Sequence, residues 1–143
     1  MHESGAQNPD SIYCQRQAIR MYEQIRNRRT DYINVARNTR FSVEQCKIVK
    51  DYLFINRHEL TGGYKTFYPD FAIASSWMRL SEKNGKRIER HDAILLYHEL
   101  YEIQLMLSYS EMSQSRAHKI AENKYNYSNE AERYYKGFGG NSE

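Results

Sequence analysis

The scarcity of helix-breaking residues most limits what this chain of 143 residues can fold into. It contains two prolines and seven glycines, and between them run long segments whose apolar residues recur at helical intervals. Such spacing gathers apolar side chains on one face of a helix. The length is that of a single domain. We therefore predict an all-α fold, a single compact multi-helix domain.

The apolar pattern predicts helices over residues 11–27, 31–37, 42–57, 71–81, 91–107 and 113–126. Ser42 with Gln45, and Asp70, are expected N-terminal caps. Helix 91–107 is apolar on more than one side and is expected at the centre. For the glycine-containing segment near 60–69 we favour an ordered loop over a short hairpin. The expected divisions are a basic N-terminal helical extension (1–33), a helical domain (34–136) and a flexible tail (137–143), with residues 1–10 also mobile.

Charge is unevenly distributed along the chain. The formal net charge is +3, but residues 1–90 carry +6 and residues 91–143 carry −3. A basic region beside an acidic helix pair can hold an anionic substrate next to carboxylates, or the two regions simply pair with each other. Thirteen tyrosines favour a binding surface that is partly apolar and partly polar.

Several classes of protein are excluded by what the sequence does not contain. No stretch approaches the 18–20 apolar residues of a membrane-spanning helix, and the start of the chain has no secretory-signal pattern. The predicted site of action is therefore cytoplasmic, and any export needs a carrier. Cys14 and Cys46 lack the spacing of a zinc ribbon and are predicted to be two buried free thiols in a reducing compartment.

The densest chemical signal lies in the predicted central helix. His91, His98 and Glu102 are spaced by seven and four residues, so they project from one helix face, with Glu99 beside them. Two imidazoles and a carboxylate on one face can bind a metal or exchange protons near neutral pH. The alternative is an ordinary (i, i+4) pair of His98 and Glu102 on a solvated face, worth a few tenths of a kcal/mol.

This helix departs from the His-Glu-x-x-His signature of zinc proteases. Glu102 stands where the second histidine is needed, and His91 lies almost two turns away. A zinc-protease interpretation is therefore poor on sequence grounds. His58 and His118 are uninformative alone. If the fold brings His58 to His91 and His98, two imidazoles can act as base and acid in RNA cleavage by the ribose 2′-hydroxyl.

Nine short motifs distributed over residues 34–135 carry a family resemblance. They are Val35-Ala36-Arg37-Asn38-Thr39, Phe41-Ser42-Val43, His58-Glu59-Leu60, Phe67-Tyr68-Pro69-Asp70, Ile73-Ala74-Ser75-Ser76-Trp77-x-Arg79-Leu80, His91-Asp92, Leu95-Leu96-x-His98-Glu99, Ala117-His118 and Tyr125-Asn126-Tyr127. Together they resemble a small helical module at the C-terminal ends of bacterial polymorphic toxins and of some phage head-morphogenesis proteins. The resemblance implies a toxin-like effector, a nuclease delivered by a larger carrier and neutralised by a cognate immunity protein.

The polar members of these motifs, together with neighbouring acidic residues, are the site candidates that the resemblance implies. They are His58, Asp70, Arg79, His91, Asp92, His98, Glu99, Glu102, His118 and Asn126.

The leading hypothesis is an RNA-cleaving enzyme that needs no cofactor. His98 and His91 form the acid/base pair, Glu99 or Glu102 orients them, and His58 assists. Arg79, Lys86 and Arg87 are the predicted phosphate-binding residues. Two alternatives stay open: a non-enzymatic phage or bacterial adaptor that binds protein through its tyrosines, and a hydrolase that depends on a divalent metal.

Overall fold

The computed structural model of this chain describes residues 8–139, with side chains described up to residue 137. Within that range it contains seven α-helices and one two-stranded sheet, so the predicted all-α class is confirmed. The helices are α1 (Ile12–Asn27), α2 (Asp31–Asn38), α3 (Val43–Lys50), α4 (Phe71–Leu80), α5 (Arg90–Ser108), α6 (Gln114–Lys124) and α7 (Tyr127–Gly139). A π-helical turn, Asp51–Ile55, directly follows α3.

Side-chain caps fix where several helices begin. Ser42 and Gln45 form a reciprocal capping box at α3, as the sequence predicts. Asp70 Oδ1 accepts the Ile73 backbone N–H at 2.9 Å and caps α4. Ser113 Oγ caps α6 by accepting the Arg116 N–H at 3.1 Å. The caps Asp70 and Ser113 thus set where α4 and α6 begin, and both helices border the cleft described below.

The segment near 60–69 differs from the favoured expectation of a loop. Strands β1 (His58–Leu60) and β2 (Gly63–Lys65) pair antiparallel, with His58 opposite Lys65. Gly62 and Gly63 have φ of +96° and +130°, a region that L-residues with a side chain rarely adopt. The two glycines therefore allow the tight reversal that joins the strands, and the short-hairpin alternative is the correct one.

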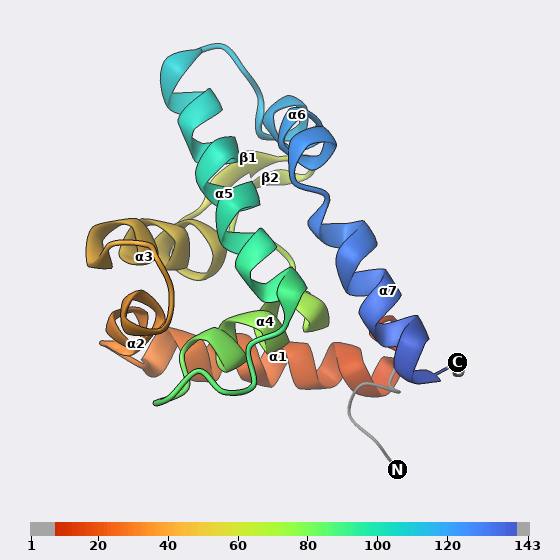
Figure 1. The fold of residues 1–143 in the computed structure, drawn as a ribbon. Coiled ribbons are helices and arrows are strands. Elements are labelled where there is room, and N and C mark those ends of the chain that lie inside the picture. The colour runs from red at the N-terminus through yellow and green to blue at the C-terminus, as the bar shows by residue number, and fades with distance from the viewer. Residues whose placement is uncertain (1–7, 140–143) are drawn as a thin grey trace.

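Helix α5 is the central element of the fold (Figure 1). It packs against α3, α4, α6 and α7, while α1 lies across α4. The core contains the fully buried side chains of Trp77, Phe54 and Leu95. Tyr22 and Ile25 of α1 belong to the same hydrophobic cluster, so the helix predicted as a basic extension packs into the core of the rest of the chain.

The last helix reaches further toward the C-terminus than the sequence predicts. Helix α7 continues to Gly139, so residues 137–139 of the predicted flexible tail are helical, and residues 1–7 and 140–143 lie outside the described residues. Cys14 and Cys46 are both buried, as predicted, and no disulfide joins them. Among the described helices, none combines the length and the apolar character that crossing a membrane requires.

Candidate metal centre

Three side chains from α5 and α6 meet at one point beneath the surface. His98 Nε2 and His118 Nδ1 each lie 3.1 Å from Glu102 Oε1, and the two ring nitrogens are 3.3 Å apart. His98 and Glu102 are one helical turn apart on α5, so they share a face, and the packing of α6 on α5 brings His118 to them. We call His98, Glu102 and His118 the ligand triad.

The spacing within the ligand triad matches one face of a metal coordination tetrahedron. Zinc lies about 2.0–2.2 Å from its nitrogen and oxygen ligands, which places two such ligand atoms about 3.3–3.5 Å apart. The three observed separations, 3.1, 3.1 and 3.3 Å, are within a few tenths of an ångström of that value. Among the described residues, this is the group of histidine, cysteine and acidic side chains whose donor atoms converge closely enough to hold an ion.

The second nitrogen of His98 determines which way its lone pair points. Nδ1 lies 3.0 Å from the Tyr125 carbonyl oxygen, which can only accept, so Nδ1 carries the proton. In the neutral ring Nε2 is then an acceptor directed at the Glu102 carboxylate. Nε2 binds the Glu102 carboxylate either through a second ring proton, as a hydrogen bond, or, in the neutral ring, through a cation shared by the two acceptors. A histidine whose outer N–H is held by a carbonyl is the usual arrangement of a metal ligand.

Two further side chains hold the outer oxygen of Glu102. The hydroxyl of Tyr52 and the Gln114 Nε2 amide, the latter at 3.1 Å, both donate to Oε2. Burial alone would raise the pKa of Glu102, but hydrogen bonds from His118, His98, Tyr52 and Gln114 outweigh it and lower that pKa to about 2. Glu102 is thus a fixed anion, with Oε1 directed at both imidazoles and Oε2 directed away.

The position of Tyr52 depends on an irregular piece of helix. Tyr52 belongs to the π-helical turn, where the Asn56 N–H bonds to the Asp51 carbonyl at 2.7 Å, five residues back. Such turns often occur at functional sites because the extra residue redirects a side chain. Burial, followed by the charge of Glu102, raises the pKa of Tyr52 above its usual range. Tyr52 therefore stays a hydrogen-bond donor to Glu102.

Glu99 lies beside the ligand triad but, unlike Glu102, accepts no hydrogen bond from the described residues. Its Oε2 is 4.0 Å from His98 Nε2, and its side chain is 7% exposed. Within the part of the chain that the structure describes, no side chain or backbone group donates a hydrogen bond to this carboxylate. Burial, and then repulsion from Glu102 and Glu122, raises the pKa of Glu99 well above its usual range.

The ligand triad opens on one side to a cleft of about 1160 Å³. His98, Glu99 and His118 line this cleft together with residues from the N-terminal segment and the start of α7. His98 and Glu102 are almost completely buried, whereas the His118 side chain is 46% exposed. The hydrogen bond to Glu102 is the main cause that raises the pKa of His118. Solvent and a substrate can thus approach the three ligand atoms from the His118 side.

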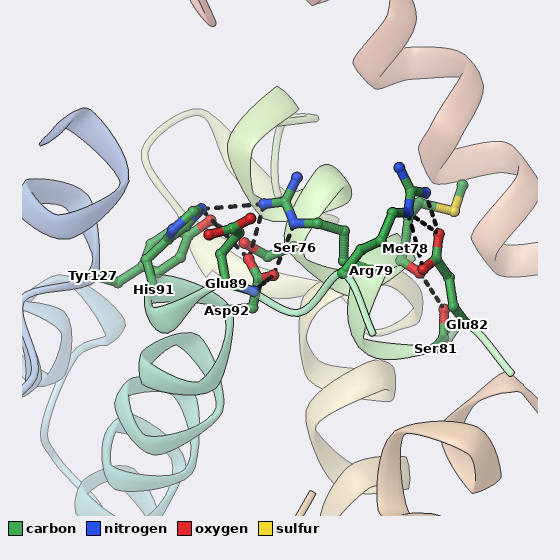
Figure 2. Close-up of polar contacts among 10 residues, drawn as sticks. Ser76, Met78, Arg79, Ser81, Glu82, Glu89, His91, Asp92 and Tyr127 are labelled. Carbon is green, nitrogen blue, oxygen red and sulfur yellow. Dashed lines mark hydrogen bonds and ion pairs between the residues drawn. The ribbon is translucent and has the colours of Figure 1, made fainter. Parts of the chain in front are cut away.

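His91 lies at the other end of α5, in a separate cluster (Figure 2). The Arg79 guanidinium binds Asp92 through two hydrogen bonds of 2.8 and 2.9 Å and donates to His91 Nε2 at 3.1 Å. Seven residues of helix separate His91 from His98, roughly 10 Å along the axis. The structure therefore does not bring together the predicted acid/base pair of His91 and His98.

The other predicted site residues are also occupied elsewhere. His58 stacks on Phe67 at 4.1 Å between ring centroids, and its Nε2 donates to the Tyr52 carbonyl at 2.8 Å. Arg79 is engaged by Asp92, and Arg87 Nε donates to both oxygens of Glu82 at 3.1 and 3.2 Å. Lys86 lies in the exposed turn before α5.

Of the predicted catalytic residues, the structure thus brings together His98, Glu99 and Glu102. It adds His118, which the family resemblance implies as a site candidate but which is not among the predicted catalytic residues. It also adds Tyr52 and Gln114, which no sequence pattern indicates. The ring of His118 reaches His98 from twenty residues away, so only the docking of α6 on α5 reveals the pair. Asp70, named by the motifs, lines the cleft as well.

Comparison of the chain with family models, with curated proteins and with solved structures finds no match.

Proposed function

We propose that this chain is a zinc-dependent hydrolase of peptide bonds. His98 Nε2, Glu102 Oε1 and His118 Nδ1 are the metal ligands, and Glu99 is the group that accepts and returns a proton. The observation that supports the proposal is the convergence of three donor atoms within 3.3 Å of one another beside an open cleft.

The number and kind of ligands favour a catalytic site over a structural one. Structural zinc sites are closed by four protein ligands, whereas catalytic sites offer three and leave the fourth position to water or substrate. Among the described residues, the ligand triad comprises three donor atoms, and His118 borders the cleft. Two imidazoles and one carboxylate are also the donor set of well-known zinc peptidases.

The order of the residues along α5 supports the same chemistry. In the His-Glu-x-x-His signature, the two histidines bind zinc and the glutamate after the first histidine is the general base. Here Glu99 follows His98 in the same way, Glu102 occupies the second ligand position, and His118 of α6 supplies the other imidazole. The donor set is therefore retained although its order in the sequence is changed.

The residues of the chain have distinct tasks in the proposed reaction. A bound divalent metal supplies Lewis acidity and lowers the pKa of a water molecule. Glu99, 4.0 Å from His98 Nε2, takes the proton of the attacking water and passes it to the amine that leaves when the peptide bond breaks. Tyr52 and Gln114 hold Glu102 in place, and the Tyr125 carbonyl holds His98.

The geometry supports metal-free RNA cleavage less well. The two imidazoles that do meet, His98 and His118, are 3.3 Å apart, which leaves no room for a phosphate between a base and an acid. Arg79 and Arg87, predicted to hold phosphate, are bound to Asp92 and Glu82. The cellular role, with a larger carrier and an immunity protein, stays a prediction.

The test is peptide hydrolysis by the zinc-loaded chain. The protein is stripped with a chelator, reloaded with one equivalent of zinc and incubated with a mixture of synthetic peptides and, separately, with total cellular RNA. We expect peptide cleavage that zinc restores. The Glu99→Gln variant should keep its zinc and lose about 100-fold or more of the rate, because it cannot take up a proton.

A matched control is Glu111→Gln, an exchange of the same kind in the exposed segment between α5 and α6. It should leave both zinc content and rate unchanged. Full activity in Glu99→Gln, or peptide cleavage that is unaffected by the chelator, would contradict the proposed function.

A further inference from the structure

The cleft beside the ligand triad has a strong excess of negative charge. Its lining includes five carboxylates, which come from the N-terminal segment and from α4, α5, α6 and α7, and a single lysine, Lys136. With the histidines neutral and every carboxylate ionised, these side chains carry a formal charge of −4, or −3 when Glu99, whose pKa is raised, holds a proton. Lys136 is itself held by Glu132 at 2.9 Å. The carboxylates are Asp10, Asp70, Glu99, Glu122 and Glu132.

Glu99 is an independent sign that a ligand belongs in this cleft. Its side chain is more than nine-tenths buried and lines the cleft, and among the described residues nothing donates a hydrogen bond to it. A buried carboxylate that accepts no hydrogen bond and has its imidazole neighbour 4.0 Å away is costly unless a ligand group meets it. A bound divalent ion together with its ligand Glu102 adds a formal charge of only +1, so the cleft still repels polyanions and attracts cations.

A smaller side pocket of about 220 Å³ joins the cleft where Tyr68, Asp70 and Glu99 line both cavities. Its apolar walls come from Leu53, Phe67 and Ile73, and the rest of its lining includes Glu102, Gln114 and His118 of the metal centre. A lysine or arginine side chain suits such a pocket, because its methylene stem lies against apolar walls while its charged end meets a carboxylate. Asp70 lines both cavities, and its Oδ1 also accepts the Ile73 N–H as the cap of α4.

We infer that the substrate is a basic polypeptide, cleaved next to a lysine or arginine whose side chain enters the side pocket and pairs with Asp70. This inference rests on the proposed function, because the ligand triad places the reacting peptide bond at the junction of the two cavities. Two further cleft carboxylates, Asp10 and Glu122, attract other basic residues of the same polypeptide, whereas Glu132 is paired with Lys136. The exposed ring of Tyr68 offers a face for a cation.

The experiment uses three quenched fluorescent peptides that differ at one central residue: lysine, norleucine, which has the same stem without the charge, or glutamate. We expect the zinc-loaded chain to cleave the lysine peptide at least about tenfold faster, as kcat/KM, than the norleucine peptide, and the glutamate peptide most slowly. The Asp70→Asn variant should lose most of this preference. Asparagine still caps a helix, so α4 should remain intact.

The control variant is Glu44→Gln, in the exposed first turn of α3, which should keep the preference. Equal rates for the lysine and norleucine peptides overturn the inference about the substrate, while zinc binding and cleavage that needs Glu99 leave the proposed function standing. A chain that neither binds zinc nor cleaves any peptide overturns both. Cleavage of RNA in place of peptides overturns the inference as well.

Discussion

Helix α5 carries two clusters of histidine and acid that look alike in the sequence and differ in the fold. At its N-terminal end His91 and Asp92 are joined by the Arg79 guanidinium, which donates to both. At its middle His98 and Glu102 meet a second imidazole, that of His118, in place of a cation. The three residues of the first cluster satisfy one another, whereas the second has three converging atoms that can each bind a cation and a side open to the cleft.

This difference separates a structural role from a chemical one. The carboxylate of Asp92 is fully buried, and Arg79, the Glu89 N–H and the helix start satisfy it. The cluster around His91 therefore holds α4 against the first turn of α5. The ligand triad has the same types of residue, but among the described residues no lysine or arginine binds it, and this is the place where we propose the chemistry. The predictions below test that division.

The largest expected effect on folding comes from breaking the cluster of Arg79, His91 and Asp92, which we call the closed cluster. Arg79→Met leaves Asp92 as a buried charge without its partner, which should lower the free energy of unfolding by about 3–5 kcal/mol. Zinc stoichiometry of the folded fraction should not change, because Arg79 does not contact the ligand triad. Urea unfolding followed by circular dichroism measures the first effect, and metal analysis of the folded protein measures the second.

The matched control is Arg87→Met. Arg87 pairs with Glu82 at the surface, where its side chain is 71% exposed, so the variant should cost less than about 1 kcal/mol. Equal losses in the two variants, or loss of zinc binding in Arg79→Met, would remove the distinction between the clusters.

An intermediate effect, on zinc affinity, is expected at the ligand triad when a hydrogen bond to Glu102 is removed. Tyr52→Phe removes one hydrogen bond to Oε2 and leaves the ring in place. Loss of such a supporting contact costs about 10-fold in metal affinity, so a zinc titration against a competing chelator should show a shift of that order. Tyr64→Phe, on the exposed strand β2, is the control and should bind zinc as tightly as the unchanged protein. An unchanged affinity in Tyr52→Phe would show that Tyr52 does not support the site.

The smallest effect concerns pH and the closed cluster. Burial, and then the positive charge of Arg79, lowers the pKa of His91 despite the opposing charge of Asp92. Because the unfolded chain binds the proton more readily, the free energy of unfolding should fall as pH drops below about 6.5. In the presence of a chelator, His91→Gln should show a shallower fall than the unchanged protein. A steeper fall in His91→Gln would reverse the sign of this contribution.

The fold was predictable from the sequence where the signal is local. The apolar repeats and the caps Ser42 and Asp70 indicate the helices, because such patterns act within a few residues. The hairpin at Gly62 and Gly63 was only the second choice after a loop, because two glycines suit a loop or a tight turn equally well. The pairing of β1 with β2 decides between them.

Of the candidate site, only the part that lies on a single helix was predictable from the sequence. The spacing of His98, Glu99 and Glu102 on one helix follows from the helical repeat. The contact of His98 with His118 depends on how α6 docks, and the bond from Tyr52 depends on a π-helical turn fifty residues earlier. Arg79 was likewise predicted to bind phosphate. The residues next to Arg79 in the sequence give no sign that Asp92, thirteen residues later, binds its guanidinium.

The most direct test is the zinc content of three proteins after equilibrium dialysis: the unchanged chain, His118→Ala and His91→Ala. His118 is half-exposed, so its loss should leave the core intact. We predict one zinc per chain in the unchanged protein and in folded His91→Ala, and an affinity lowered by more than about 100-fold in His118→Ala. An unchanged chain that binds no zinc, or a His118→Ala variant that binds it as tightly, would contradict the assignment of His98, Glu102 and His118 as a metal site.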